Sequence, residues 1–166
     1  QLGRLSEVIT HHASRITPTL LYARSQNNNH LVSEAAGLYT ASLALPDHPD
    51  AEKWKKLGIK WLNWSFENQI DENGEYIQHS VNYHRLMLQL AVWVNTIGES
   101  SWMTKKARKN LANATLWLAN LTDPLSGNIV NLGSNDGAYI FPLTNSDFRD
   151  AQPVLKAASY AFLSGT

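Results

Sequence analysis

The sequence contains no cysteine. This absence excludes disulfide frameworks, zinc sites built on thiolates and cysteine nucleophiles. The chain also lacks an excess of one charge, because 14 Lys and Arg residues balance 14 Asp and Glu residues among 166. A balanced chain has no broad electrostatic attraction for polyanions, so we do not expect nucleic acid as a partner.

Long apolar runs are missing as well. The longest, around residues 86–94, is shorter than the roughly 20 residues that cross a bilayer, and Gln89 interrupts it. We therefore predict no membrane span. The sequence begins at Gln1, with neither an initiator Met nor a signal-like segment, so we expect a processed protein or a piece of a longer one.

Apolar and aromatic residues, by contrast, are plentiful. They make up 43% of the sequence, which includes six Trp, six Tyr and four Phe. Each aromatic side chain can bury roughly 150 to 250 Å², and a chain of this length is an ordinary size for one domain. We predict that residues 1–166 form a single folded domain.

Apolar residues recur at three- and four-residue steps through most of the chain, which indicates an all-α fold. Residues 122–145 are polar and rich in turn signals, and short strands or turns are expected around 128–132 and 138–141. The predicted helices cover 32–45, 51–70, 80–97, Ser100 or Ser101 to about Leu121, and 146–162, with Pro153 as the weak point of the last.

A weak internal repeat of about fifty residues relates 54–69 to 102–121. Each unit would be an antiparallel helical hairpin, and about five or six helices are expected in all. In this arrangement the helices that start near Asn29, Ser80 and Ser146 are equivalent. Their N-termini would then lie at one common rim of the domain.

Three polar clusters fall at that rim: residues 27–30 with Glu34, residues 79–85, and residues 133–137. Helix N-termini carry unpaired N–H groups and a positive dipole end, which suit a carboxylate, a sulfate or a hydroxyl-rich ligand. A plainer interpretation is helix capping, by Asn28 or Asn29 and by Ser80. Glu34 is favoured in a first helical turn whatever its function.

Five stretches of the sequence resemble a known family. Residues 25–38 (SQNNNHLVSEAAGL), 46–62 (PDHPDAEKWKKLGIKWL) and 71–85 (DENGEYIQHSVNYHR) resemble the helical domain of the heparinase II/III family of polysaccharide lyases. Residues 133–143 (GSNDGAYIFPL) and 147–155 (DFRDAQPVL) resemble the subgroup found with bacterial surface-polysaccharide genes. The resemblance covers about residues 25–163. It implies part of an incomplete α/α toroid, with the C-terminal β-sandwich domain of the family lying outside residues 1–166.

The resemblance also implies a reaction, the β-elimination of a polysaccharide that contains uronic acid. Asn29 and His30 match the family residues that bind and neutralise the uronate carboxylate. Tyr83 matches the tyrosine that transfers a proton, either as general base or as acid toward the departing glycosidic oxygen. Its pKa would have to fall, with the help of a neighbour, or the proton would have to move in concert. The residues expected to bind substrate or shape the site are Glu34, His84, Arg85, Asn135 and Asp136.

Partners and location follow from the same resemblance. The expected partners are an acidic polysaccharide or oligosaccharide and the protein's own C-terminal β domain. No cofactor or metal is expected in this part of the chain, and any structural metal would belong to the β domain. The expected location is periplasmic or extracellular. Residues 1–166 alone are expected to be inactive, because the family takes further catalytic residues from the β domain.

Two alternatives remain open from the residues alone. A glycoside hydrolase on a similar toroid needs two carboxylates, roughly 6.5 to 9.5 Å apart for inversion. Its candidates are Glu34, Asp71, Glu72 and Asp136, none of which forms as specific a pattern as the Asn-His and Tyr-His clusters. The other alternative is a non-catalytic carbohydrate-binding helical scaffold, in which Tyr and Trp side chains at the rim stack on sugars.

Overall fold

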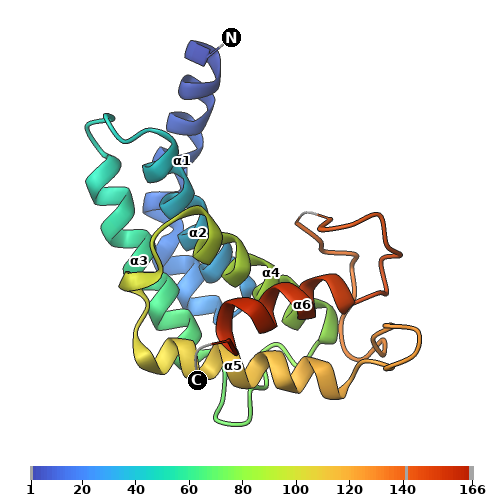
Figure 1. The fold of residues 1–166 in the computed structure, drawn as a ribbon. Coiled ribbons are helices and arrows are strands. Elements are labelled where there is room, and N and C mark those ends of the chain that lie inside the picture. Colours follow the sequence, from blue (N-terminus) through green and yellow to red (C-terminus); the bar gives the residue numbers. More distant parts are fainter. Residues whose placement is uncertain (1, 141, 165–166) are drawn as a thin grey trace.

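The computed structural model describes residues 2–140 and 142–164, and these residues form six α-helices and no strand. The prediction of an all-α fold is therefore confirmed (Figure 1). The helices are α1 (Leu2–Gln26), α2 (Asn29–Ala44), α3 (Ala51–Asn68), α4 (Val81–Ile97), α5 (Lys105–Asn120) and α6 (Gln152–Phe162), with a short 3₁₀ turn at Ser100–Trp102.

Helices α2 and α3 form an antiparallel hairpin that is closely packed at Gly58. A Cβ atom at this position would lie 2.9 Å from the backbone nitrogen of Tyr39 and 3.0 Å from the carbonyl oxygen of Ala35. Both distances are shorter than an ordinary van der Waals contact, so only glycine lets the two helices come this close. The loop between them contains Pro46 and Pro49, which end α2.

A second hairpin, α4 with α5, repeats the direction of the first. Asn29 at the start of α2 is bonded to Gln78 just before α4, and Thr40 near the end of α2 is bonded to Trp93 near the end of α4. These two contacts show that α2 and α4 run parallel. Helix α6 continues the series beside α4 (Figure 1).

Helices α3 and α5 are also parallel to each other. The Asn63 side chain of α3 contacts Thr104 at the start of α5, and Asn110, further along α5, donates to the carbonyl of Ile70. Successive hairpins are therefore stacked side by side, and the helical repeat expected from the sequence is present in space. This stacking brings the first turns of α2 and α4 to the same end of the domain.

The structure differs from the sequence prediction at three places. Helix α1 was not predicted as an element, and its first turns extend beyond the other helices (Figure 1). Helix α5 starts at Lys105 rather than at Ser100 or Ser101, because the Thr104 side chain caps it by accepting from the N–H of Ala107. Helix α6 starts at Gln152 rather than at Ser146, since Pro153 occupies its first turn and not its interior.

The polar segment between α5 and α6 forms turns joined by isolated bridges. The described residues there pair at Thr122 with Ile129 and at Asn128 with Asp150. Of the two stretches expected to form short strands or turns, 128–132 takes part in these bridges. The stretch 138–141 has no strand among its described residues, and position 141 lies outside them.

Candidate functional site

The first turn of α2 is fixed by Asn28. Its side-chain oxygen accepts a hydrogen bond from the N–H of His30 at 3.0 Å, so Asn28, and not Asn29, is the helix cap. The backbone N–H of Asn29 donates to Oε1 of Gln78 at 2.9 Å. The buried amide of Gln69 adds a second link, donating to the carbonyl of Asn28 at 3.0 Å. These contacts tie the start of α2 to the segment that leads into α4.

The side chains of Asn29 and His30 are left without a hydrogen bond to any described residue. Asn29 is half-buried and His30 is exposed. Because Asn28 caps the helix, the side-chain amide of Asn29 is not needed as a cap and forms no hydrogen bond within the described structure. Both side chains are therefore available to a ligand at the start of α2.

Tyr83 lies in the first turn of α4, which Ser80 caps by accepting from its N–H at 3.2 Å. The Tyr83 hydroxyl donates to Oδ2 of Asp136 at 2.6 Å, although the two residues are 53 positions apart. This bond raises the pKa of Tyr83, and it lowers the pKa of the Asp136 carboxyl. The pKa of Tyr83 thus moves in the opposite direction from the fall expected from the sequence.

The loop that carries Asn135 and Asp136 lies against the start of α4. The N–H of Val81 donates to the carbonyl of Leu132 at 3.0 Å, and the Ser80 hydroxyl donates to the carbonyl of Ser134 at 2.6 Å. Between these contacts Gly133 has a φ of +77°, and a Cβ there would lie 2.2 Å from the carbonyl oxygen of His79. Glycine is required at this position, both for its conformation and for the close approach. The second and third polar clusters therefore meet, as the rim hypothesis predicts.

His84 was expected to contact substrate, and its position corrects this expectation. The side chain is 1% exposed, it stacks on Trp117 with ring centres 4.5 Å apart, and Nε2 is bonded to the carbonyl of Ala114 at 2.9 Å. Burial lowers the pKa of His84 to about 4, so the ring is neutral at pH 7. His84 is a core residue that joins α4 to α5 and does not reach a ligand at the surface.

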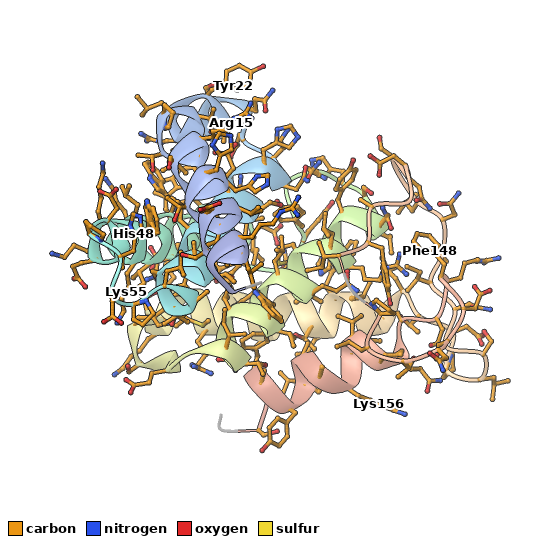
Figure 2. All side chains as sticks on the ribbon, turned by 90° about the horizontal axis from the view of Figure 1, so that it is seen from above. Arg15, Tyr22, His48, Lys55, Phe148 and Lys156 are labelled. Atoms are coloured by element: carbon orange, nitrogen blue, oxygen red, sulfur yellow. The ribbon has the colours of Figure 1, made fainter. Side chains whose placement is uncertain are left out.

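Arg85 is also 1% exposed, so a direct contact with substrate is not supported for it either. Its guanidinium donates to the carbonyl of Phe148 and, at 2.9 Å, to Oδ1 of Asn82. The guanidinium carbon lies 4.8 Å from the ring centre of Tyr139 and 4.2 Å from that of Phe148. Arg85 thus holds the loop between α5 and α6 against α4; Figure 2 labels Phe148 on this loop.

Glu34 faces α1 and has its hydrogen bond there. Its carboxylate accepts from the Thr19 hydroxyl at 3.0 Å, and partial burial raises its pKa. His30 lies one turn earlier. Its charge lowers the pKa of Glu34, an effect smaller than that of burial, and no hydrogen bond joins the two side chains. This position suits a residue that stabilises the contact between α1 and the start of α2.

An apolar hollow of about 610 Å³ lies between α1, α2 and α4. Residues such as Ile16, Leu90 and Trp93 line it, and much of the lining comes from parts of α2 and α4 beyond their first turns. A sugar needs several hydrogen-bonding groups around it. This hollow is therefore not a candidate carbohydrate site.

Unfolding measurements should reveal the buried, neutral state of His84. Its pKa is about 4 in the folded chain and about 6.5 in an unfolded one, so stability is complete above pH 6.5 and is lost as the pH falls toward 4. The expected loss is about 3 kcal/mol in the free energy of unfolding. A His84→Gln variant, which can still donate to the carbonyl of Ala114, should lose that much less between pH 7 and pH 4 in urea titrations. An equal fall in both proteins would show that His84 does not titrate in this way.

Replacing Asp136 by Asn should lower the pKa of Tyr83. The charge and the strong acceptor that favour the protonated phenol are then gone, although an amide oxygen can still accept a bond. The pKa is measurable from the pH titration of the Tyr83 ring signals by NMR. Asp147→Asn is the matched control, since that carboxylate accepts from the N–H of Arg149 instead. If both variants leave the pKa of Tyr83 unchanged, Asp136 does not control it.

No group of three or more His, Asp or Glu side chains placed to hold a metal ion occurs within residues 2–140 and 142–164. Over the same described residues, no helix is both long enough and apolar enough to cross a membrane.

Comparisons with known proteins bear on the family of this chain. A heparin-sulfate lyase of Bacteroides thetaiotaomicron is 35% identical over 63 residues, which are 38% of this chain and 9% of that protein. The chain thus corresponds to a small part of the curated relative. No solved structure is a significant match. The family model of the heparinase II/III N-terminus matches residues 6–124, which include the first turns of α2 and α4 but not the loop with Asp136. Since this match covers most of its length, the chain belongs to the heparinase II/III family.

Proposed function

We propose that this chain is the helical part of a polysaccharide lyase that cleaves a uronate-containing polysaccharide by β-elimination. One observation carries the proposal: the first turns of α2 and α4 lie at the same end of the domain, linked by the bond from Asn29 to Gln78. This arrangement places Asn29, His30 and Tyr83 on neighbouring parallel helices at one rim. The family relationship supplies the reaction class.

Asn29 and His30 would bind the uronate carboxylate. The proton next to that carboxylate is weakly acidic, so the enzyme has to neutralise the carboxylate and stabilise the charge that develops as the proton leaves. The Asn29 amide and the His30 ring are both donors without a partner in the described structure. One such donor contributes about 2.7 to 4 kcal/mol to the transition state in comparable sites.

Tyr83 would transfer a proton during the elimination. A base takes the proton from the carbon beside the carboxylate, the C–H electron pair forms a carbon–carbon double bond, and the C–O bond to the glycosidic oxygen breaks. Tyr83 would give its phenolic proton to that oxygen, and we propose that the base comes from the β domain. A tyrosine hydroxyl with its ordinary pKa of about 10 is protonated at pH 7, so Tyr83 is ready to act as acid toward the departing oxygen. Because that hydroxyl donates to Asp136, substrate would have to displace this carboxylate first.

The stacked hairpins support the proposed architecture. Parallel α2, α4 and α6 with parallel α3 and α5 are the pattern expected of one segment of an α/α toroid. We further propose that the family's β-sandwich domain is the partner that completes the site, and that the whole enzyme needs no cofactor in its helical part. We propose the periplasm or the outside of the cell as its location.

The hydrolase alternative has less support in the structure. Asp71 accepts from the backbone N–H groups of Asn73 and Glu75, so it stabilises its own turn. Glu34 is bonded to Thr19 and Asp136 to Tyr83. No two of these carboxylates share a hydrogen-bonding partner among the described residues.

Product analysis distinguishes the candidate functions. The longer protein that contains this chain is incubated with a uronate-containing polysaccharide, and both ultraviolet absorbance and new reducing ends are followed. A lyase produces an unsaturated uronate that absorbs, so both signals should rise together. Reducing ends without absorbance would indicate a hydrolase, and binding without either signal would indicate a scaffold.

A further inference from the structure

A pocket of about 300 Å³, lined by both polar and apolar residues, adjoins the candidate site. Asn82 of α4 lines it, together with residues 129–131, Asn135, Phe148 and Arg149 of the connecting loops. Asn82 precedes Tyr83 in the first turn of α4, and Asn135 precedes Asp136. Two of the residues that line the pocket therefore adjoin Tyr83 and Asp136 in sequence.

Asn82, which lines this pocket, has an unused hydrogen-bond donor. The side chain is 3% exposed, and its Oδ1 accepts from the guanidinium of Arg85 at 2.9 Å. Because Arg85 can only donate, this bond fixes which end of the amide is the oxygen. The amide nitrogen Nδ2 has no partner among the described residues, and neither does Nε of Arg85. A buried donor without an acceptor lowers the stability of the fold, so an acceptor supplied by a ligand would be favourable at Nδ2.

The other side chains of the pocket include further donors. Oδ1 of Asn131 accepts from Asn135, which leaves the amide nitrogen of Asn131 to donate. Arg149 is an exposed cation at the pocket wall. The nearby carboxylates of Asp147 and Asp150 each accept a backbone N–H, from Arg149 and Gln152, and among the described residues neither forms an ion pair with the Arg149 side chain. A donor-rich pocket is complementary to an oxyanion.

We propose that this pocket is a subsite that binds the carboxylate of a second uronate unit, next to the unit held at Asn29 and Tyr83. The proposal rests on the proposed function and extends it to residues beyond the family match, which ends at residue 124. The volume lies at the lower end of the range for ligand pockets, which suits one sugar unit. Asn82 would donate to the carboxylate, and Arg149 would supply the opposite charge.

The test uses the chain itself with glucuronate as the probe and glucose as its neutral analogue. Binding is followed in ¹H–¹⁵N spectra through the side-chain amides of Asn82 and Asn29. Glucuronate should shift the Asn82 amide and glucose should not. Inorganic sulfate is titrated separately, because a sulfate group presents the same kind of acceptor. If sulfate shifts the Asn82 amide and glucuronate does not, the carboxylate assignment is wrong.

Asn82→Asp is the decisive variant. It keeps an oxygen for Arg85 and replaces the donating NH₂ by a second oxygen, so the affinity measured at the neighbouring Asn131 amide should fall about tenfold or more. Asn120→Asp adds the same charge at an exposed position and should bind glucuronate normally. If Asn82→Asp does not fold, Arg149→Gln takes its place, with an expected fall of about threefold.

The outcomes separate this proposal from the proposed function. Shifts at Asn29 without shifts at Asn82 would refute the subsite and leave the lyase site standing. Shifts at Asn82 without shifts at Asn29 would support the subsite while contradicting the role given to Asn29. Unchanged affinity in Asn82→Asp would also overturn the subsite.

Discussion

Tyr83→Phe should lower kcat by roughly 10²- to 10⁴-fold if the protein is the lyase proposed above. The substitution removes the hydroxyl that would transfer a proton, and the ring still packs at the start of α4. Stability should barely change, because the lost bond joins Tyr83 to an exposed carboxylate on Asp136. Steady-state turnover and the melting temperature, measured on the same preparation, test both expectations.

A matched control removes the partner and keeps the hydroxyl. Asp136→Asn should fold normally and retain far more activity than Tyr83→Phe, since Asp136 holds the proton donor but does not replace it. Equal losses in the two variants would place the essential group on Asp136. Normal turnover in Tyr83→Phe would remove Tyr83 from the chemistry altogether.

Asn29→Ala should lower kcat/KM by roughly 10²- to 10³-fold, because it removes a donor that acts on the developing charge. The fold should tolerate the change. The contact that Asn29 makes with Gln78 uses its backbone N–H, which alanine also has. The structure therefore predicts a large kinetic effect and a small thermal one.

Asn28→Ala is the control for this second variant, and the opposite result is expected from it. Its side chain caps α2 by accepting from the N–H of His30, so its loss should cost about 1 kcal/mol of stability. Turnover should remain close to normal. If Asn29→Ala instead loses stability and keeps its kcat/KM, the first cluster is only a helix cap and the domain returns to the scaffold class.

The hairpins were predictable because their signals are local. Apolar residues recur along α3 and α5 at helical spacing, and Ser80 marks the start of α4 as a typical cap. The fifty-residue spacing then indicated that α2 and α4 begin at the same end. The contact between Asn29 and Gln78 agrees with that prediction.

The sequence prediction sets no bounds for helix α1, although the signal for them is present. Ile9, Ala13, Ile16, Leu20 and Ala23 recur at alternating steps of four and three residues and pack against the core. Pro18 lies within this helix and weakens the helical pattern around it. The predicted start of the last helix, at Ser146, is also wrong because of a proline. That prediction makes Pro153 an interior residue, whereas proline is favoured in the first turn of a helix, where the structure has it.

The sequence predicts which polar clusters lie near one another, but it does not predict the direction in which each side chain points. One step along a helix turns a side chain by about 100°, so His84 and Arg85 cannot share the face of Tyr83. A cluster that is continuous in sequence is therefore divided between the rim and the core. The bond between Tyr83 and Asp136 depends on the path of an irregular loop, which no periodic pattern describes.

In the proposed function, the first turns of α2 and α4 form one uronate-binding site. The most direct test is an NMR titration of this chain with a glucuronate-containing oligosaccharide, following the Asn29 side-chain amide and the Tyr83 ring. Both signals should shift along a single binding curve, and Asn29→Ala should weaken the binding seen at Tyr83 about tenfold. Signals that shift with different affinities, or a response at one residue and none at the other, would contradict the claim.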